Sequence, residues 1–393
     1  MSKLTWILIF AKGTMKRLFT LLILACLTCS LVFSQQKLEK ISMRDTLDNQ
    51  FDFSNFLINA NGFIPLPQLI TEPALGGIGL ALAPVFIQPN KYPNPQGYTQ
   101  PNITAVAGMY TANKSWFVGG FRSGAITKHQ MKYRVFAGYG SINLDLYREL
   151  PIVGESQFPF NFKTGLVSGT LLKEIQKSNV FVGVQYTLLD TEVSPEFLMT
   201  GDELPNFIQE KSLNTLQSLP GVLVEIDKRD NIFTPNSGAF FHADFKVSAD
   251  WTGSDFTYQT LRIFLFKYFQ FKENWVGGFR LETQQQFGNA PFFLEPGLNM
   301  RGVPLGRYQG TATYLLETEQ RLDLSLRWSV LGFVGAAKAI PEDKTFGNAD
   351  WVNNYGVGFR YLAARLFKLR MGVDLAWSQE SFGYYIVFGS AWR

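Results

Sequence analysis

The stretch GLNMRGVPLGRYQGTATYLLETEQR, residues 297–321, joins a loop rich in glycine and proline to a segment in which every second residue is polar or charged. Alternation at this period predicts a β-strand, because successive side chains of a strand point to opposite faces. One face of the strand is too charged to be the core of a soluble protein, since it carries Thr311, Thr313, Leu315, Glu317, Glu319, Arg321 and Asp323. The strand belongs either to a soluble sheet with a wet outer face or to a transmembrane barrel with polar residues toward its lumen.

The N-terminus has the pattern of a secretory signal peptide. Lys16 and Arg17 precede LFTLLILACLTCSLVFS, an apolar run that is too short to span a membrane. We expect translation to begin at Met15 and cleavage to follow Ser34. A lipoprotein signal that ends before Cys26 and an uncleaved membrane anchor are the alternatives. The expected segments are a signal peptide at 1–34, a short periplasmic lead-in at 35–61 and a transmembrane barrel at 62–393.

Removing this leader changes the charge and the cysteine content of the chain. The leader holds four of the 36 basic residues and none of the 32 acidic ones, so the exported chain carries 32 of each. Balanced charge gives no reason to expect nucleic acid or another polyanion as a partner. Both cysteines, Cys26 and Cys29, lie in the leader. Disulfides, cysteine nucleophiles and cysteine-ligated metals are therefore excluded from the exported chain.

Regular alternation and the placement of tryptophan favour the membrane barrel. Every odd position of 238–251 and of 366–377 is apolar, and most even positions of 238–251 are polar. The tryptophans that follow the leader lie at strand ends, as in the aromatic girdles of membrane barrels. No run of 18 apolar residues follows the leader, so helical spans are not expected.

The predicted fold is all-β, a closed transmembrane antiparallel β-barrel. Fifteen strands can be placed between residues 75 and 392. A barrel with both ends in the periplasm has an even number of strands, so about sixteen are expected. The missing strand is predicted inside 129–178 or at 62–71.

Four short motifs follow one another in the second half of the chain. EIDKRDNIFTPNSG at 225–238 has the pattern D-x-R-D-N-x-x-x-P-x-x-G, and it is followed by MRGV at 300–303, FVG at 333–335 and GYYIVFGSAW at 383–392. Together they resemble the BamA/TamA-type bacterial surface antigen family of outer-membrane barrels, in a variant without periplasmic POTRA modules. The first motif is carried by Asp227, Arg229, Asp230, Asn231, Pro235 and Gly238, and the closing strand by Gly383, Phe388 and Trp392.

The resemblance implies a long loop that folds into the lumen, with Arg301 and Gly302 at its tip. In FVG, the acid that normally meets the loop arginine is missing. Glu317 and Glu319 share the inward face of the strand after the loop, so we predict that Arg301 pairs with one of them, because a dry and unpaired arginine would be costly. A solvated Arg301 is the alternative. The motif at 227–238 is predicted to stabilise a periplasmic turn.

The family resemblance also implies a location and a function. The location is the outer membrane of a Gram-negative bacterium, in contact with outer-membrane lipids and lipopolysaccharide. The implied function is insertion or transfer of outer-membrane proteins or lipids through a barrel whose first and last strands part easily. Because the lead-in is too short for the family's capture modules, a periplasmic or lipoprotein partner would supply substrate capture. The alternative is a passive channel or structural barrel with a latched internal loop.

Catalysis is not expected. His242, Asp244 and Ser248 share one predicted inward face, whereas outer-membrane hydrolases place such groups toward lipid, where their substrate arrives. No HExxH motif, phosphate-binding glycine loop or calcium loop is present. The sequence predicts neither a cofactor nor a metal site.

Overall fold

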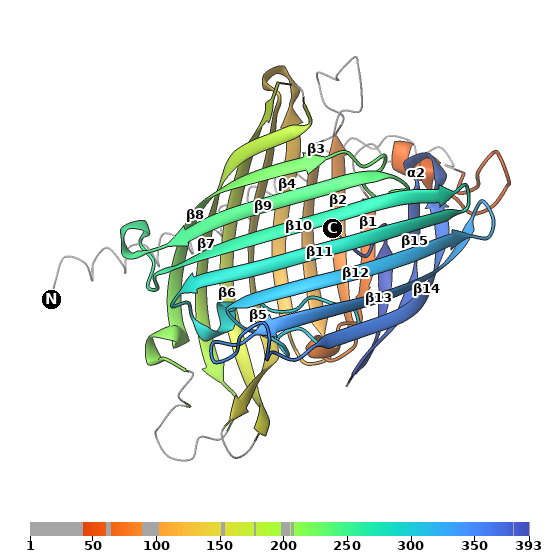
Figure 1. The fold of residues 1–393 in the computed structure, drawn as a ribbon. Helices are drawn as coiled ribbons and strands as arrows, with labels where there is room; N and C mark the ends of the chain where they lie inside the picture. The colour runs from red at the N-terminus through yellow and green to blue at the C-terminus, as the bar shows by residue number, and fades with distance from the viewer. Residues whose placement is uncertain are drawn as a thin grey trace. The chain divides into compact units, whose positions relative to one another are not determined.

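The computed structural model describes residues 42–59, 64–88, 102–150, 154–176, 178–197, 205, 208–379 and 381–392. The predicted signal peptide, residues 1–34, lies outside this part of the chain. Sixteen strands within it form one sheet, in which each strand pairs with the next one along the sequence (Figure 1). All of these pairings are antiparallel. The predicted all-β class and strand number are confirmed.

The strands are β1 Ile64–Ile70, β2 Gly79–Gln88, β3 Asn102–Thr111, β4 Trp116–Ile126, β5 Met131–Leu150, β6 Gly154–Ile175, β7 Val180–Pro195, β8 Asn214–Asp227, β9 Gly238–Ser248, β10 Tyr258–Lys272, β11 Trp275–Gly288, β12 Ala312–Asp323, β13 Trp328–Ile340, β14 Val352–Ala364, β15 Leu369–Ser378 and β16 Phe382–Phe388. The helical elements are the α-helix α2 Ser54–Asn59 and the 3-10 helices η2 Pro73–Leu75, η3 Thr127–His129, η4 Glu210–Leu213, η5 Asp250–Thr252, η6 Phe292–Leu294 and η7 Arg365–Phe367. No helix in the described part of the chain has the length and apolar character needed to cross a membrane.

The two faces of the sheet differ as expected for a barrel in lipid. In β14, the outward-facing Tyr355, Val357 and Phe359 are 45% to 58% exposed. Asn354 and Arg360 on the inner face of the same strand are at most 2% exposed. Polar side chains on the inner face and apolar ones on the outer face reverse the arrangement of a soluble protein.

The strand missing from the sequence prediction is β1, at one of its two expected positions. Pro65 and Pro67 interrupt its apolar pattern, which is why it could not be assigned directly. Proline has no backbone N–H and is confined to edge strands or bulges of a sheet. β1 satisfies this rule, because it is the first strand of the sheet and pairs only with β2.

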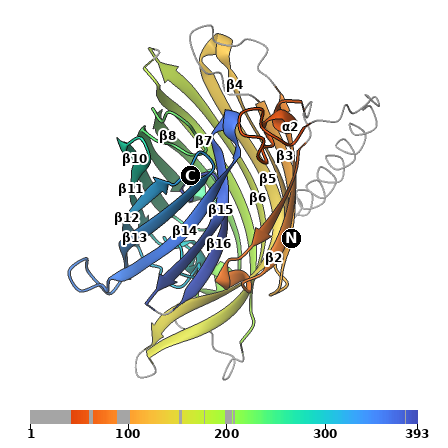
Figure 2. The same ribbon diagram turned by 90° about the vertical axis from the view of Figure 1, so that its right-hand side faces the viewer.

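The barrel is nearly closed rather than closed as predicted. β1 and β16 are the two ends of the sheet and lie next to each other (Figure 2), but no strand pairing joins them among the described residues. We call the boundary between β1 and β16 the seam. The backbone N–H and C=O groups that face the seam do not form a continuous ladder of hydrogen bonds. Those at the other fifteen strand boundaries do.

The last strand is shorter than predicted, and this changes the position of Trp392. β16 ends at Phe388, and Gly389 has a left-handed φ of 80°. Trp392 then lies on the inner side, 5% exposed, in a cluster with Phe240, Phe266 and Tyr268. The prediction of one strand from 383 to 392 is wrong, because the chain turns inward after Gly389. This turn lets Trp392 pack against buried aromatic rings instead of facing lipid.

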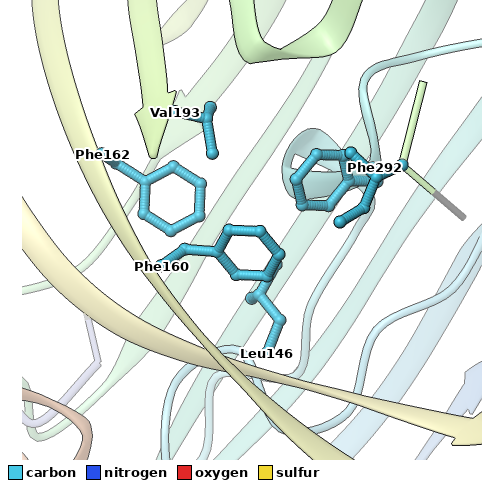
Figure 3. Packing of buried hydrophobic residues seen from close by; sticks show 6 residues of the cluster. Leu146, Phe160, Phe162, Val193 and Phe292 are labelled. Carbon is cyan, nitrogen blue, oxygen red and sulfur yellow. The ribbon is translucent and has the colours of Figure 1, made fainter. Parts of the chain in front are cut away.

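An apolar cluster lies where β5, β6 and β7 meet the loop between β11 and β12 (Figure 3). Phe160 is 0% exposed and packs against Phe292 of η6, with ring centroids 5.2 Å apart. Leu146, Phe162 and Val193 complete the contacts shown in the figure. These contacts fix the beginning of the loop that carries Arg301.

Candidate functional site

The loop between β11 and β12, residues 289–311, brings Arg301 against three carboxylates. The Nη1 atom of Arg301 donates to Glu319 at 2.8 Å and to Asp374 at 2.7 Å, and Nη2 donates to Glu317 at 2.7 Å. The guanidinium also lies 3.6 Å from the centroid of the Phe333 ring. Arg301 is 9% exposed, and the side chains of Glu317 and Asp374 are fully buried. The planar fork of arginine suits such a site, because it serves several carboxylate oxygens at once.

Glu317 also links the loop to the end of the chain. Its Oε1 atom accepts from the indole Nε1 of Trp392 at 2.6 Å as well as from Arg301. Its Oε2 atom accepts from the amide of Asn354 at 3.3 Å, and the same amide donates to the Arg301 carbonyl at 2.9 Å. One buried carboxylate therefore connects the loop, β14 and the segment that follows β16.

Asp374 is the partner of Arg301 that sequence reasoning missed. It lies on β15 and also accepts two hydrogen bonds from Arg360 of β14. Asp374 occupies an even position of 366–377, opposite the apolar face, but the sequence gave no means of ranking it above other acids, since strands β12 and β15 are not neighbours. A Cβ at Gly335, the position at which the resemblance led us to expect an acid, would stand 2.5 Å from the Asn354 oxygen and 3.2 Å from Glu317. In this chain Glu317 and Asn354 occupy that space, and Asp374 supplies the additional charge.

Gly302 allows the loop to approach the wall closely. Its φ of 85° lies in the left-handed region, and a Cβ there would be 3.0 to 3.1 Å from backbone atoms of Ala376 and Trp377. Its N–H donates to the Tyr385 hydroxyl at 2.8 Å, and its carbonyl accepts from Ser381. These bonds attach the loop to the C-terminal side of the seam.

The same loop also contacts the N-terminal side of the seam. The N–H of Leu305 donates to Glu72, which lies between β1 and β2, at 3.2 Å. Burial raises the pKa of Glu72, although the N–H donors of Leu305 and Ala74 act in the opposite direction. Because Leu305 and Gly302 are only three residues apart, this short segment connects both sides of the seam.

The motif at 227–238 forms the turn between β8 and β9, and many of its polar groups bond to one another. Arg229 donates to both carboxylate oxygens of Asp227, at 2.9 and 2.7 Å. Asp230 accepts the backbone N–H groups of residues 236 and 237, while Asn231 accepts those of residues 233 and 234. Gly238 has a φ of 103°, and a Cβ there would be 2.1 Å from the Lys228 carbonyl oxygen.

Other residues of this motif connect the turn to neighbouring structure. Pro235 is buried within the turn. Asn231 donates to the carbonyl of Phe367 in η7 at 3.1 Å. None of the hydrogen bonds described for the turn involves Arg301.

The closing-strand residues have different environments. Gly383 is buried, and a Cβ there would stand 2.7 Å from the Tyr385 hydroxyl that binds the loop. Phe388 is 40% exposed on the outer face. Of the three predicted residues, Trp392 alone contacts the Arg301 network directly, through Glu317.

The polar residues of β9, His242, Asp244 and Ser248, make two separate sets of contacts. His242 interacts with Asp244 at 3.1 Å, and Asp244 also accepts from Arg262. The Ser248 hydroxyl instead donates to Gln217 and to the Phe256 carbonyl. The serine is thus engaged at a different site from the histidine.

Comparison with known proteins identifies the fold. No protein-family model matches the chain, and no curated protein matches it in sequence. The structure resembles BamA from Haemophilus ducreyi lacking POTRA domains 1–3, with a TM-score of 0.54 and 13% identity over 88% of this chain and 80% of that one. It also resembles CdiB from Escherichia coli, with a TM-score of 0.55 and 8% identity over 82% of this chain and 62% of that one. The chain therefore has the β-barrel fold of these proteins and spans less than two thirds of the length of CdiB.

Proposed function

We propose that this chain is an outer-membrane barrel that inserts or transfers outer-membrane proteins or lipids by opening its seam, in a Gram-negative bacterium. A periplasmic or lipoprotein partner would deliver the substrate, and outer-membrane lipids and lipopolysaccharide would surround the barrel. The proposal contains no catalytic step. It rests on the chemistry of the seam and on the loop that connects its two sides.

The observation that carries the proposal is the weak edge presented by β1. Its ladder with β2 runs without a break from Ile64 to Ile70. Pro65 and Pro67 cannot donate to any ladder, so we infer that their nitrogens face β16, where no pairing is disturbed. β16 is only seven residues long, so few of its backbone groups could pair with β1. An edge that lacks two donors beside a short strand gives a boundary that separates at lower cost than the others.

The loop is proposed to hold the seam shut on the lumenal side. It binds β15 and β16 through Gly302, binds the β1–β2 connection through Leu305, and is itself fixed by Arg301. Opening the seam requires some of these hydrogen bonds to break. The Arg301 network would then keep the loop on the C-terminal side while the Leu305 contact is released.

Depletion of the protein in its host tests this function. Other outer-membrane proteins, or surface lipids, should fall in abundance in the isolated outer membrane before growth slows. A catalogue of outer-membrane proteins and lipids that is unchanged after complete depletion would remove the insertion or transfer proposal. Chromosomal re-expression of the native chain is the control.

A passive channel or structural barrel is the second candidate, favoured by a half-open hollow over β4, β5 and β6. The hollow has a volume of about 330 Å³ and is lined by polar Ser123, Arg134, Ser168 and Thr170 together with apolar residues of β4 and β5. Conductance in planar bilayers separates the two candidates. A plain pore should give large and steady openings, whereas a seam held by a loop should give small and brief ones.

A further inference from the structure

Residues 43–59 form a segment that docks on the ends of the C-terminal strands, and we call it the N-terminal strap. Its first part folds back on itself through the bridge between Arg44 and Phe51. The N–H of Phe53 donates to the Ala363 carbonyl at 2.9 Å, and the Tyr361 hydroxyl donates to the Phe51 carbonyl at 2.8 Å. Figures 1 and 2 show α2 beside the turn between β14 and β15. The strap is thus attached to β14, on the opposite side of the seam from β1.

Charge makes this attachment specific. Arg327, in the turn between β12 and β13, donates through Nε to Asp48 at 2.6 Å and through Nη1 to Asp52 at 2.6 Å. Its Nη2 atom donates to Asp45, which also accepts from Arg365 of η7. Arg327 is 4% exposed. Three strap carboxylates and two barrel arginines thus form one ion cluster, and networks of this kind hold their partners better than isolated surface pairs do.

The strap precedes β1 in the sequence, and β1 lies across the seam from β14, to which the strap is attached. Ser54 is fixed to η7, because its hydroxyl accepts the Leu366 N–H at 3.2 Å. From there, α2 spans about 9 Å and the five residues up to Ile64 reach about 17 Å at most, which gives a maximum of about 26 Å. β14 and β1 are separated by three strand spacings, or about 14 Å. The remaining slack is about 12 Å, or roughly two strand spacings.

We propose that the N-terminal strap limits the width to which its end of the seam can open. This inference rests on the proposed opening of the seam. While the ion cluster is intact, the seam admits about one added hairpin at the strap end. Any wider opening requires Asp45, Asp48 and Asp52 to leave Arg327. A substrate strand or a partner that displaces the strap would therefore control how far the barrel opens.

Distance measurements between nitroxide labels test the strap directly. Residues 35–393 contain no cysteine, so labels can be placed at chosen sites without background. One pair, at Phe86 and Phe388, spans the strap end of the seam. A second pair, at Leu80 and Phe382, spans the other end. Pulsed electron paramagnetic resonance gives the distance distribution for each pair in lipid nanodiscs.

The ion cluster is removed by combining Asp45→Asn, Asp48→Asn and Asp52→Asn, which leaves every barrel residue native. We expect the strap-end distribution to broaden toward longer distances, with little change at the other end. Asp350→Asn is the matched control, since the side chain of Asp350 is 86% exposed and pairs with Lys344 in a distant loop. Arg327→Ala should repeat the effect from the barrel side.

Two outcomes would overturn the inference. One is an unchanged strap-end distribution in both variants, with native heat-modifiable gel migration as proof of folding. The other is equal broadening at both ends. The measurement uses no substrate, so its outcome can be told apart from that of the depletion experiment. If the strap-end distance distribution broadens but depletion has no effect, the strap inference stands and the proposed function fails. If depletion has an effect but the strap-end distribution is unchanged, the proposed function stands and the strap inference fails.

Discussion

Replacing Arg301 by alanine removes the one cation that three carboxylates share. Glu317 and Asp374 stay buried after the substitution, because β12 and β15 hold them in place. Breaking a buried pair by removing one partner costs about 3 to 5 kcal/mol, chiefly for the charge left behind. Arg360 still donates hydrogen bonds to Asp374, and the Trp392 indole still donates one to Glu317. We therefore expect the lower end, about 3 kcal/mol, which is roughly a hundred-fold in the unfolding equilibrium.

Denaturant unfolding in lipid vesicles measures this loss, and limited proteolysis reports the loop. Arg301→Ala should lower the free energy of unfolding by the amount given above and should make residues 289–311 sensitive to protease. Adding Glu317→Gln should recover part of the loss, because it removes one of the stranded charges. Asp350→Ala is the control, with an expected effect below about 0.5 kcal/mol for an exposed pair. If Arg301→Ala unfolds at the same denaturant concentration as this control and its loop remains resistant, the buried-cluster reasoning is refuted.

Two further predictions concern Trp392 and the strap. Trp392→Phe keeps an aromatic ring but removes the donor to Glu317, so unfolding should cost about 1.5 to 3 kcal/mol less, and an unchanged value would show that the indole bond contributes nothing. The hydrogen bond from Arg365 lowers the pKa of Asp45, and the one from Arg327 lowers that of Asp48. Their contribution is therefore complete above the ordinary aspartate pKa of about 3.9 and is lost only as the pH falls through the lowered folded values. A nitroxide at Leu47 should stay immobile from pH 7 to pH 5 and become mobile only well below pH 4, whereas mobility that rises between pH 7 and pH 5 would contradict the ion cluster.

The fold could be predicted because it depends on local patterns. Alternation in stretches such as 238–251 fixes which side chains face lipid, and the requirement for an even number of strands pointed to the strand that Pro65 and Pro67 concealed. The inward turn of Trp392 could not be predicted in the same way. The alternation of GYYIVF gives no sign of where the strand ends, and the energy gained by the turn comes from Phe240, Phe266 and Tyr268, which are distant in sequence.

The candidate site was predictable only in part, for a similar reason. Glu317 and Glu319 follow the loop directly, so their strand and parity sufficed to place them near Arg301. Asp374 belongs to a strand that is not adjacent to β12, so its contact with Arg301 depends on the course of the loop at 289–311 and not on strand order. The strap was missed because Asp45, Asp48 and Asp52 follow neither the period of a helix nor that of a strand. What the three residues share is their contact with Arg327, which is distant in the sequence.

The opening of the seam is tested most directly by locking it. Cysteines at Leu69 and Tyr384, on the outer faces of β1 and β16, can be joined by a short cleavable bis-maleimide, because residues 35–393 contain no native cysteine. A matched control joins Leu69 to Leu80, which already face each other across the β1–β2 ladder. The locked seam should fail to restore outer-membrane composition in depleted cells, and cleavage of the linker should restore it. A locked seam that works as well as the control would contradict the account.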